Sequence, residues 1–197
     1  AAFLAVLGCV IGGITVTGLN PDSQQGDKVI LDILKRCGGK FKPVEGGLHF
    51  DRSLLKATEI DLADCPDLGP ILFTLGCFCS GETVIRNAGR LRLKESDRIE
   101  AMQTELRKMG ARIEVDGDTV HIQGVALHAP NAPLSGHNDH RIVMALAVAA
   151  IASGLPALLC GAEAVDKSWP AFWSVLRGLG AKVELNTDKQ EEFDIKA

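Results

Sequence analysis

The sequence predicts an α+β fold in which one folding unit occurs three times, and two observations support this prediction. First, Gly38, Gly110 and Gly180 lie about 70 residues apart, and each follows a segment with helical spacing of apolar residues. Second, a more apolar helix and a short strand precede each segment, and strand-like residues follow each glycine. The period exceeds that of a solenoid, so we expect a pseudo-threefold arrangement with approximate units 1–51, 52–124 and 125–197.

The first unit is incomplete, because it begins inside a helix and has no opening strand. We expect a helix over 1–11, a strand over 14–18, a helix over 28–35 and a hairpin of 40–42 with 48–50. A residue at the C′ position of a helix commonly adopts φ > 0, which suits the glycine that ends the second helix of each unit.

The second and third units have their opening strands. For the second unit we expect strand 58–62, helix 68–79, strand 82–86, helix 98–109 and hairpin 111–115 with 119–122. For the third we expect strand 127–129, helix 140–152, strand 157–159, helix 170–179 and strand 181–185. The third unit shows no clear return strand, so the polar tail Asn186–Ala197 is expected to fray.

The core is expected to consist of the apolar helices. The run Ala145 to Ile151 is apolar on every side, and such a helix belongs inside a protein, with the sheets packed around it. With 197 residues and 46% hydrophobic residues, the chain has enough apolar surface to form a single domain over 1–197. The spacing of Trp169, Phe172 and Trp173 places them on the core face of a helix.

Charge and cysteine usage exclude several classes of function. A net charge of -4 and a pI near 5.7 argue against a nucleic-acid partner, which requires a surplus of Lys and Arg. The apolar start of the chain has no basic flank and is too short to cross a bilayer, so we expect no membrane partner. The six cysteines lack the spacing of a metal site and indicate buried thiols in the cytoplasm, with no metal or cofactor.

A charged segment, Arg90–Arg98, leads into the second amphipathic helix. Free N–H groups and the helix dipole favour an anion at such a helix start, and Lys94 and Arg98 add positive charge there. Ser96 or Asp97 is a natural N-cap. The alternative is a solvated, capped helix start with no ligand.

Other unusual residues lie in loops that precede helices. These loops are 20–27, 64–67, 94–98, 136–141 and 163–170. If the units are symmetric, the loops meet at one end and form a surface for a small, multiply anionic substrate, with carboxylates for proton transfer. Each residue also has an interpretation that involves no substrate. Asp67 and Asp139 could each cap a helix, and Lys167 could be an ordinary loop lysine.

Four segments resemble the C-terminal half of the 5-enolpyruvylshikimate-3-phosphate synthase family. They are Leu91–Arg98, Asn138–Ala145, Pro66-Asp67 and Asp166–Pro170, and the similarity extends over nearly the whole chain. The resemblance implies two domains, each an inside-out α/β barrel of three βαβαββ units that close around the substrates. This chain would be the C-terminal half, with the N-terminal domain as its missing partner.

The family transfers the carboxyvinyl group of phosphoenolpyruvate to the 5-hydroxyl of shikimate 3-phosphate, without a metal. The resemblance implies that Asp67 deprotonates the hydroxyl and that Glu95 protonates the vinyl methylene. It further implies that Lys94 contacts shikimate 3-phosphate and that Arg98 and Arg141 bind the carboxylate of phosphoenolpyruvate. The remaining implied roles are phosphate binding and proton shuttling by Lys167, and support from His140.

Two departures from the family pattern qualify this expectation. Arg90 stands where the family often has a neutral residue, and the site residues of the other domain are absent from this chain, so we expect little turnover from it alone. Two alternatives stay open: an enzyme like UDP-N-acetylglucosamine carboxyvinyltransferase, and a non-catalytic anion-binding module.

Overall fold

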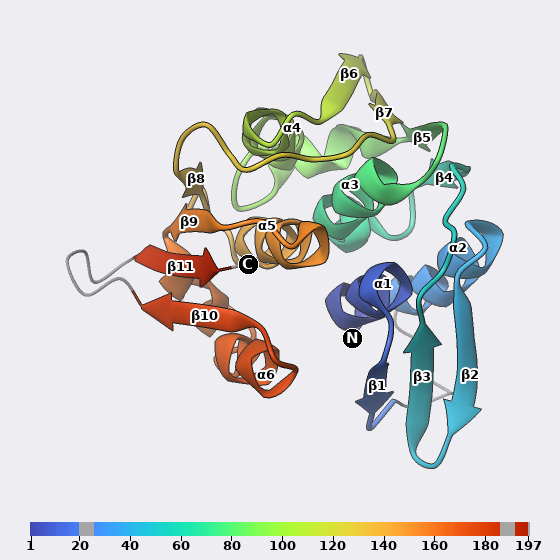
Figure 1. Cartoon of the computed structure of the whole chain (residues 1–197). Helices are drawn as coiled ribbons and strands as arrows, with labels where there is room; N and C mark the ends of the chain where they lie inside the picture. The colour runs from blue at the N-terminus through green and yellow to red at the C-terminus, as the bar shows by residue number, and fades with distance from the viewer. Residues whose placement is uncertain (20–25, 186–191, 197) are drawn as a thin grey trace.

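The computed structural model describes residues 1–19, 26–185 and 192–196, and the fold is α+β, with helices between three sheets (Figure 1). The longer helices are α1 (Ala2–Ile11), α2 (Ile30–Arg36), α3 (Gly69–Phe78), α4 (Arg98–Lys108), α5 (His140–Ser153) and α6 (Phe172–Gly178). Four 3₁₀ segments accompany them: η1 (Gly26–Val29), η2 (Pro66–Leu68), η3 (Ala88–Leu93) and η4 (Ala162–Lys167). In the described residues no helix combines the length and apolar character needed to cross a membrane.

Each sheet is built largely from hairpins. The first has the order β1 (Ile14–Thr17), β3 (Gly47–Asp51), β2 (Lys40–Val44). The second has the order β4 (Glu59–Asp61), β5 (Glu82–Arg86), β7 (Thr119–Gln123), β6 (Arg112–Asp116). The third has the order β10 (Lys182–Leu185), β11 (Glu192–Lys196), β9 (Ala157–Cys160), β8 (Leu134–Ser135).

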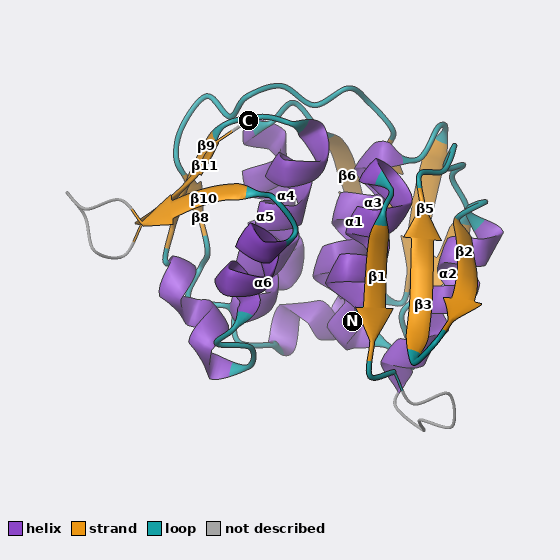
Figure 2. Ribbon diagram, turned by 60° about the horizontal axis from the view of Figure 1, so that its bottom comes forward, coloured by secondary structure: helices purple, strands orange, loops and turns teal. Residues whose placement is uncertain are grey.

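The second and third sheets contain one parallel pair each, β4 with β5 and β8 with β9. Among the described residues the first sheet, β1-β3-β2, has no such pair. Figure 2 shows the sheets on the outside and the helices between them.

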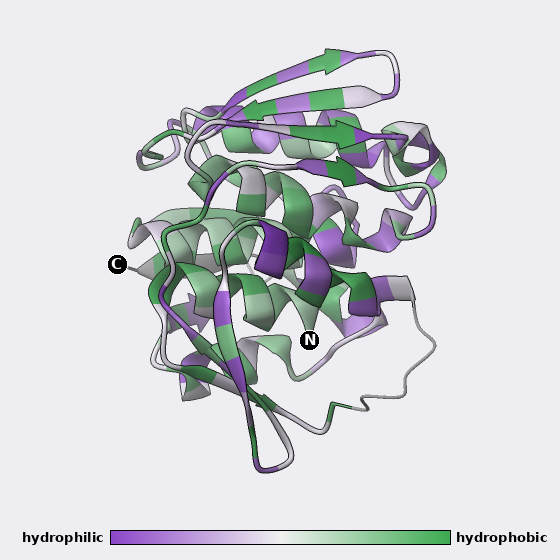
Figure 3. Ribbon diagram, turned by 90° about the vertical axis from the view of Figure 1, so that its right-hand side faces the viewer, coloured by the Kyte–Doolittle hydropathy of each residue, from purple (hydrophilic) through white to green (hydrophobic). Residues whose placement is uncertain are grey.

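The core lies where α1, α3 and α5 contact one another. The sequence predicts these helices to be the most apolar ones, and most of their residues are buried. Figure 3 shows their ribbons largely green, while the outer strands alternate in colour. Between α3 and α5, the Thr74 hydroxyl donates to the Ala145 carbonyl at 3.0 Å, which satisfies a polar group inside the core.

The helix ends follow the prediction. Gly38, Gly110 and Gly180 have φ of 82°, 86° and 93°, the left-handed conformation expected after a helix. The aromatic face of α6 is also confirmed, since Phe172 and Trp173 are buried with ring centroids 5.0 Å apart.

The predicted opening strand of the third unit, 127–129, is wrong. The strand in this position is β8, and it pairs in parallel with β9. Residues 128–131 instead lie along the end of α4, where the His128 N–H donates to the Met109 carbonyl at 2.9 Å and the Asn131 N–H donates to the Lys108 carbonyl at 3.2 Å. The end of α4 therefore satisfies backbone groups that a sheet would otherwise have paired.

The prediction that the third unit lacks a return strand is also wrong. Strand β11 pairs antiparallel with both β10 and β9, so this part of the tail is not frayed. Ile195 lies opposite Val183 and Ala157 and is buried, which gives the strand an apolar anchor. The rest of the expected tail, residues 186–191 and 197, lies outside the described residues.

Candidate active site

The predicted site residues lie where several helices begin. Asp67 belongs to η2, just before α3, and Arg98 is the first residue of α4. His140 and Arg141 open α5, and Lys167 ends η4. Of the predicted loops, residues 20–25 lie outside the described residues. The other loops supply side chains that contact one another.

Arg98 and Asp139 form the buried centre of the cluster. The Arg98 Nε donates to Asp139 Oδ2 at 2.7 Å, and its Nη2 donates to Oδ1 at 3.2 Å. The side chains are 3% and 0% exposed, so water screens this pair little. Burial would raise the pKa of Asp139, but Arg98, the N–H of Arg141 and the Ser96 hydroxyl outweigh it and hold the pKa below its usual value.

Asp67 accepts from three cations. Its carboxylate lies 3.1 Å from the Lys94 Nζ, 3.3 Å from an Arg98 nitrogen and 3.2 Å from an Arg141 nitrogen. Partial burial would raise the pKa of Asp67, but the hydrogen bond from Lys94 and the charges of the two arginines hold it below its usual value. The alternative interpretation as a cap is wrong, because neither η2 nor α3 has a side-chain cap.

Glu95 lies on the other side of the cluster. One of its carboxylate oxygens is 3.2 Å from His140 Nδ1, and the other is 3.8 Å from the Lys167 Nζ. The Lys167 ammonium also donates to the backbone carbonyl of Asn138 and, at 2.8 Å, to its side-chain oxygen. Through these contacts Lys167 joins the end of η4 to the turn before α5.

The predicted caps are present. Asp97 accepts from the N–H groups of Ile99 and Glu100 and caps α4, and Asp139 accepts from the N–H of Arg141 and caps α5. Asp139 thus serves both as a cap and as the partner of Arg98. Arg90, whose role the sequence leaves in doubt, donates to the carbonyl of Ala63 at 3.1 Å.

Sequence reasoning missed three residues of the cluster. It treated Asp139 only as a cap, because nothing local signals a partner 41 residues away. The sequence assigns no individual role to Asn138, which only begins a segment of the resemblance, or to Asp27, which lies in one of the loops. Asp27 lies 3.7 Å from Arg141, and burial raises its pKa despite that cation. The signal that could have found them is their place near the start of a helix, Asp27 within η1 before α2 and Asn138 and Asp139 before α5.

Glu95, Asp139 and His140 are the described residues whose ligand atoms lie close enough together for a metal ion, within 4.8 Å. The Asp139 oxygens already accept from Arg98, Ser96 and the N–H of Arg141. A metal ion would have to displace Arg98 from its buried partner, so this donor set suits a guanidinium better than a metal.

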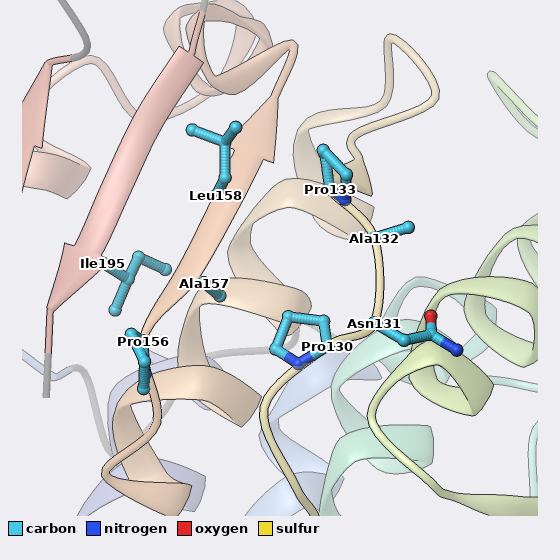
Figure 4. Close-up of a pocket in the computed structure, with 8 residues that line it drawn as sticks. All are labelled: Pro130, Asn131, Ala132, Pro133, Pro156, Ala157, Leu158 and Ile195. Carbon is cyan, nitrogen blue, oxygen red and sulfur yellow. The ribbon is translucent and has the colours of Figure 1, made fainter.

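A separate hollow of about 470 Å³ lies away from the cluster, between the segment before β8 and strands β9 and β11 (Figure 4). It is lined by Pro130, Asn131, Ala132, Pro133, Pro156, Ala157, Leu158 and Ile195. None of these residues is charged, so the hollow lacks the cations that the cluster provides.

The charged cluster itself is partly open to solvent. Asp67, Glu95 and Lys167 have side-chain exposures of 41%, 40% and 43%, while Arg98 beneath them is buried. Cations in such a position bind carboxylate and phosphate groups, and the two carboxylates are accessible for proton transfer.

Comparisons with known proteins show what the whole chain is similar to. The family profile of EPSP synthase (3-phosphoshikimate 1-carboxyvinyltransferase) matches residues 1–176. The 3-phosphoshikimate 1-carboxyvinyltransferase of Clostridium acetobutylicum is 44% identical over 93% of this chain and 42% of its own length. The corresponding protein of Methanocaldococcus jannaschii is 39% identical over 94% of this chain and 43% of its own length.

Solved structures extend the comparison. EPSP synthase from Acinetobacter baumannii superposes with a TM-score of 0.74 at 26% identity, over 90% of this chain and 44% of that one. The enolpyruvyl transferase NikO from Streptomyces tendae gives 0.72 at 21% identity, over 91% of this chain and 42% of that one, which supports the fold alone. The chain spans less than half the length of these relatives.

Proposed function

The chain belongs to the EPSP synthase family, and from this membership we propose that it contributes one half of an active site for carboxyvinyl transfer. The reaction would move the carboxyvinyl group of phosphoenolpyruvate to the 5-hydroxyl of shikimate 3-phosphate, a step of aromatic amino acid biosynthesis in the cytoplasm. The enzyme activity for which the relatives are named supports this reaction, as do the segments Leu91–Arg98 and Asn138–Ala145.

One observation carries the proposal: Asp67 and Glu95 stand in one cationic cluster but have different partners. Asp67 is held by Lys94, Arg98 and Arg141, whereas Glu95 contacts His140 and lies near Lys167. Different surroundings let two carboxyl groups take opposite parts in one reaction. This supports Asp67 as the base and Glu95 as the acid.

In the proposed mechanism Asp67, ionised because of its cations, accepts the proton of the 5-hydroxyl as that oxygen attacks the vinyl carbon. Glu95 delivers a proton to the methylene carbon, which gives a tetrahedral intermediate. Arg98 and Arg141 bind the carboxylate of phosphoenolpyruvate, because a planar guanidinium offers paired donors. Lys94 binds shikimate 3-phosphate. The bond from the intermediate to the phosphate oxygen then breaks while the new methyl group returns a proton to Glu95, which re-forms the vinyl double bond. Lys167 stabilises the departing phosphate, and the phosphate or solvent takes the proton from Asp67.

His140 supports Glu95 through their contact. We further propose that the three βαβαββ units are related by pseudo-threefold symmetry and that this chain is the C-terminal of two domains. The open face of the cluster supports a second domain as its cover, since a site that water enters freely stabilises charge poorly. The chain alone is then expected to have little or no activity.

The test is reconstitution in trans. The chain is mixed with the N-terminal domain of the Clostridium acetobutylicum relative, and phosphate release from phosphoenolpyruvate is measured with shikimate 3-phosphate as acceptor. We expect release from the mixture, and none from either part alone or from a mixture with the Glu95→Gln chain. No release from the mixture, although the parts associate, would count against the proposal.

The alternatives are separated in the same assay. Release with UDP-N-acetylglucosamine in place of shikimate 3-phosphate would favour the sister enzyme. NMR titration of the chain with both substrates tests the non-catalytic module. Shifts confined to residues 67, 94–98, 141 and 167, together with turnover in the mixture, support a half-site.

A further inference from the structure

Glu105 is a buried carboxylate that the proposed chemistry does not use. Its side chain lies in α4 and is 2% exposed. The Ser135 N–H donates to Oε2 at 2.8 Å, the Lys108 ammonium donates to the same oxygen at 2.7 Å, and His137 Nε2 lies 3.0 Å from Oε1. Replacing a buried ion pair with apolar side chains of similar volume often leaves a protein equally stable. Stability alone therefore does not explain why a carboxylate occupies the position of Glu105.

One partner of Glu105, His137, lies in a strained turn before α5. His137 and Asn138 have φ of 49° and 53°, a left-handed conformation that is unfavourable for residues with a Cβ atom. Two such residues in succession persist only where their surroundings hold them. The described structure holds His137 through its N–H, which donates to the Ser135 hydroxyl at 3.2 Å, and through its ring, which contacts Glu105.

This turn delivers two groups to the site. The backbone and side-chain oxygens of Asn138 accept from Lys167, and the next residue, Asp139, binds Arg98 at two points. A change in the turn would therefore move Lys167 and Arg98 together. No direct contact between Glu105 and either cation is seen in the described structure, whereas His137 contacts Glu105 and begins the turn that leads to Asn138 and Asp139.

We propose that Glu105 and His137 are positioning residues, which hold the left-handed turn so that Asn138 sets Lys167 and Asp139 sets Arg98. The inference deepens the proposed function and rests on it, because the placement matters only if these cations bind substrate. An ionised carboxylate only accepts hydrogen bonds, so in the contact with Glu105 the His137 ring has to carry a proton on Nε2. The presence of that proton therefore shows whether the contact is made.

The test compares four variants of the full chain. Glu105→Gln keeps the shape but removes the charge, and His137→Ala removes the ring but leaves the strain. His137→Gly removes both the ring and the strain, since glycine adopts positive φ freely. Glu114→Gln, on the exposed face of β6, is the matched control for loss of a carboxylate.

The readouts are the ¹⁵N shifts of the His137 ring, the amide resonances of Asn138 and Asp139, and the dissociation constant for phosphoenolpyruvate. We expect Glu105→Gln and His137→Ala to shift the amide resonances of Asn138 and Asp139. Both variants should also raise the dissociation constant for phosphoenolpyruvate about fivefold, a change that corresponds to the free energy of one hydrogen bond. His137→Gly is expected to recover part of that loss, and Glu114→Gln to change nothing.

The inference is overturned if Glu105→Gln lowers only the free energy of unfolding and leaves the Asn138 and Asp139 resonances unchanged. If Glu105→Gln fails to fold, the two His137 variants decide, since that side chain is 33% exposed. Equal effects of the alanine and glycine variants would then contradict the role of the strained turn. If the mixture with the N-terminal domain releases no phosphate, the proposed function fails, whereas the resonances of the free chain still test this inference.

Discussion

Arg98 and Asp139 form a two-point ion pair inside the molecule, with nitrogen to oxygen distances of 2.7 and 3.2 Å and almost no exposure to solvent. The pair joins the first residue of α4 to the residue that caps α5. Because Arg98 also contacts Asp67, the same guanidinium connects three helix starts.

We expect Asp139→Ala to lower the free energy of unfolding by about 3 to 5 kcal/mol, because it leaves the Arg98 charge buried without its partner. The control is Asp97→Ala, which removes the other cap and is expected to cost about 1 kcal/mol. Urea unfolding followed by tryptophan fluorescence measures both. Equal losses in the two variants would contradict a central role for the pair.

Stability is expected to decrease in acid. The pKa values of Asp67 and Asp139 are lower in the folded chain than those of ordinary carboxyl groups. Their contribution is therefore complete above about pH 4, the ordinary range for Asp, and is lost as the pH falls through the folded values. Unfolding from pH 7 to pH 3 should show this decrease, and a weaker dependence in Asp139→Asn. An identical pH profile in that variant would refute the assignment.

Asp67→Asn is expected to affect binding and turnover in opposite directions. Removing the carboxylate leaves Lys94, Arg98 and Arg141 without their internal counter-ion, so inorganic phosphate should bind at least about threefold more tightly. The reconstituted enzyme should lose about a hundredfold or more in turnover, because the proposed base is gone. Calorimetry and the phosphate-release assay measure the two effects.

The matched control for Asp67→Asn is Asp116→Asn, at the exposed end of β6. It should leave binding and turnover unchanged. If Asp67→Asn instead binds phosphate more weakly, the main effect of the Asp67 carboxylate is to hold Lys94, Arg98 and Arg141 in place. Neutralisation of their charge would then be the smaller effect.

Lys167→Met is expected to impair activity without affecting stability. The side chain is 43% exposed, so its loss should change the free energy of unfolding by no more than about 0.5 kcal/mol. Turnover of the reconstituted enzyme should fall by about a hundredfold, because the departing phosphate loses its cation. Undiminished turnover would remove Lys167 from the proposed mechanism.

Thiol labelling is expected to distinguish Cys160 from the other five cysteines. Cys9 and Cys77 are fully or almost fully buried, and burial raises their pKa values to about 11 and about 12, so little reactive thiolate forms at pH 8. Cys160 is only half-buried. Iodoacetamide followed by mass spectrometry should modify Cys160 first, and all six in urea. Equal rates for Cys77 and Cys160 in the folded chain would contradict this.

The sequence determined what depends on near neighbours. The spacing of apolar residues predicted the buried helices, the glycines at positive φ marked the ends of helices, and Asp97 was recognisable as a cap, because each depends on a few adjacent residues. Strand β8 has two residues, which is too short to show alternation. Strand β11 does alternate at Phe193 and Ile195, but only the register with β9 and β10 identifies it as a strand.

Only the tertiary structure decided how the charged residues pair. The sequence predicted that Lys94 and Arg98 favour an anion, but not that Asp139 and Asp67 occupy Arg98 in the free chain, nor that Glu105 contacts His137 across 32 residues. Periodicity reports which face of an element is apolar. It carries no information about which distant loop meets a given side chain, because that depends on how three sheets and three buried helices pack together.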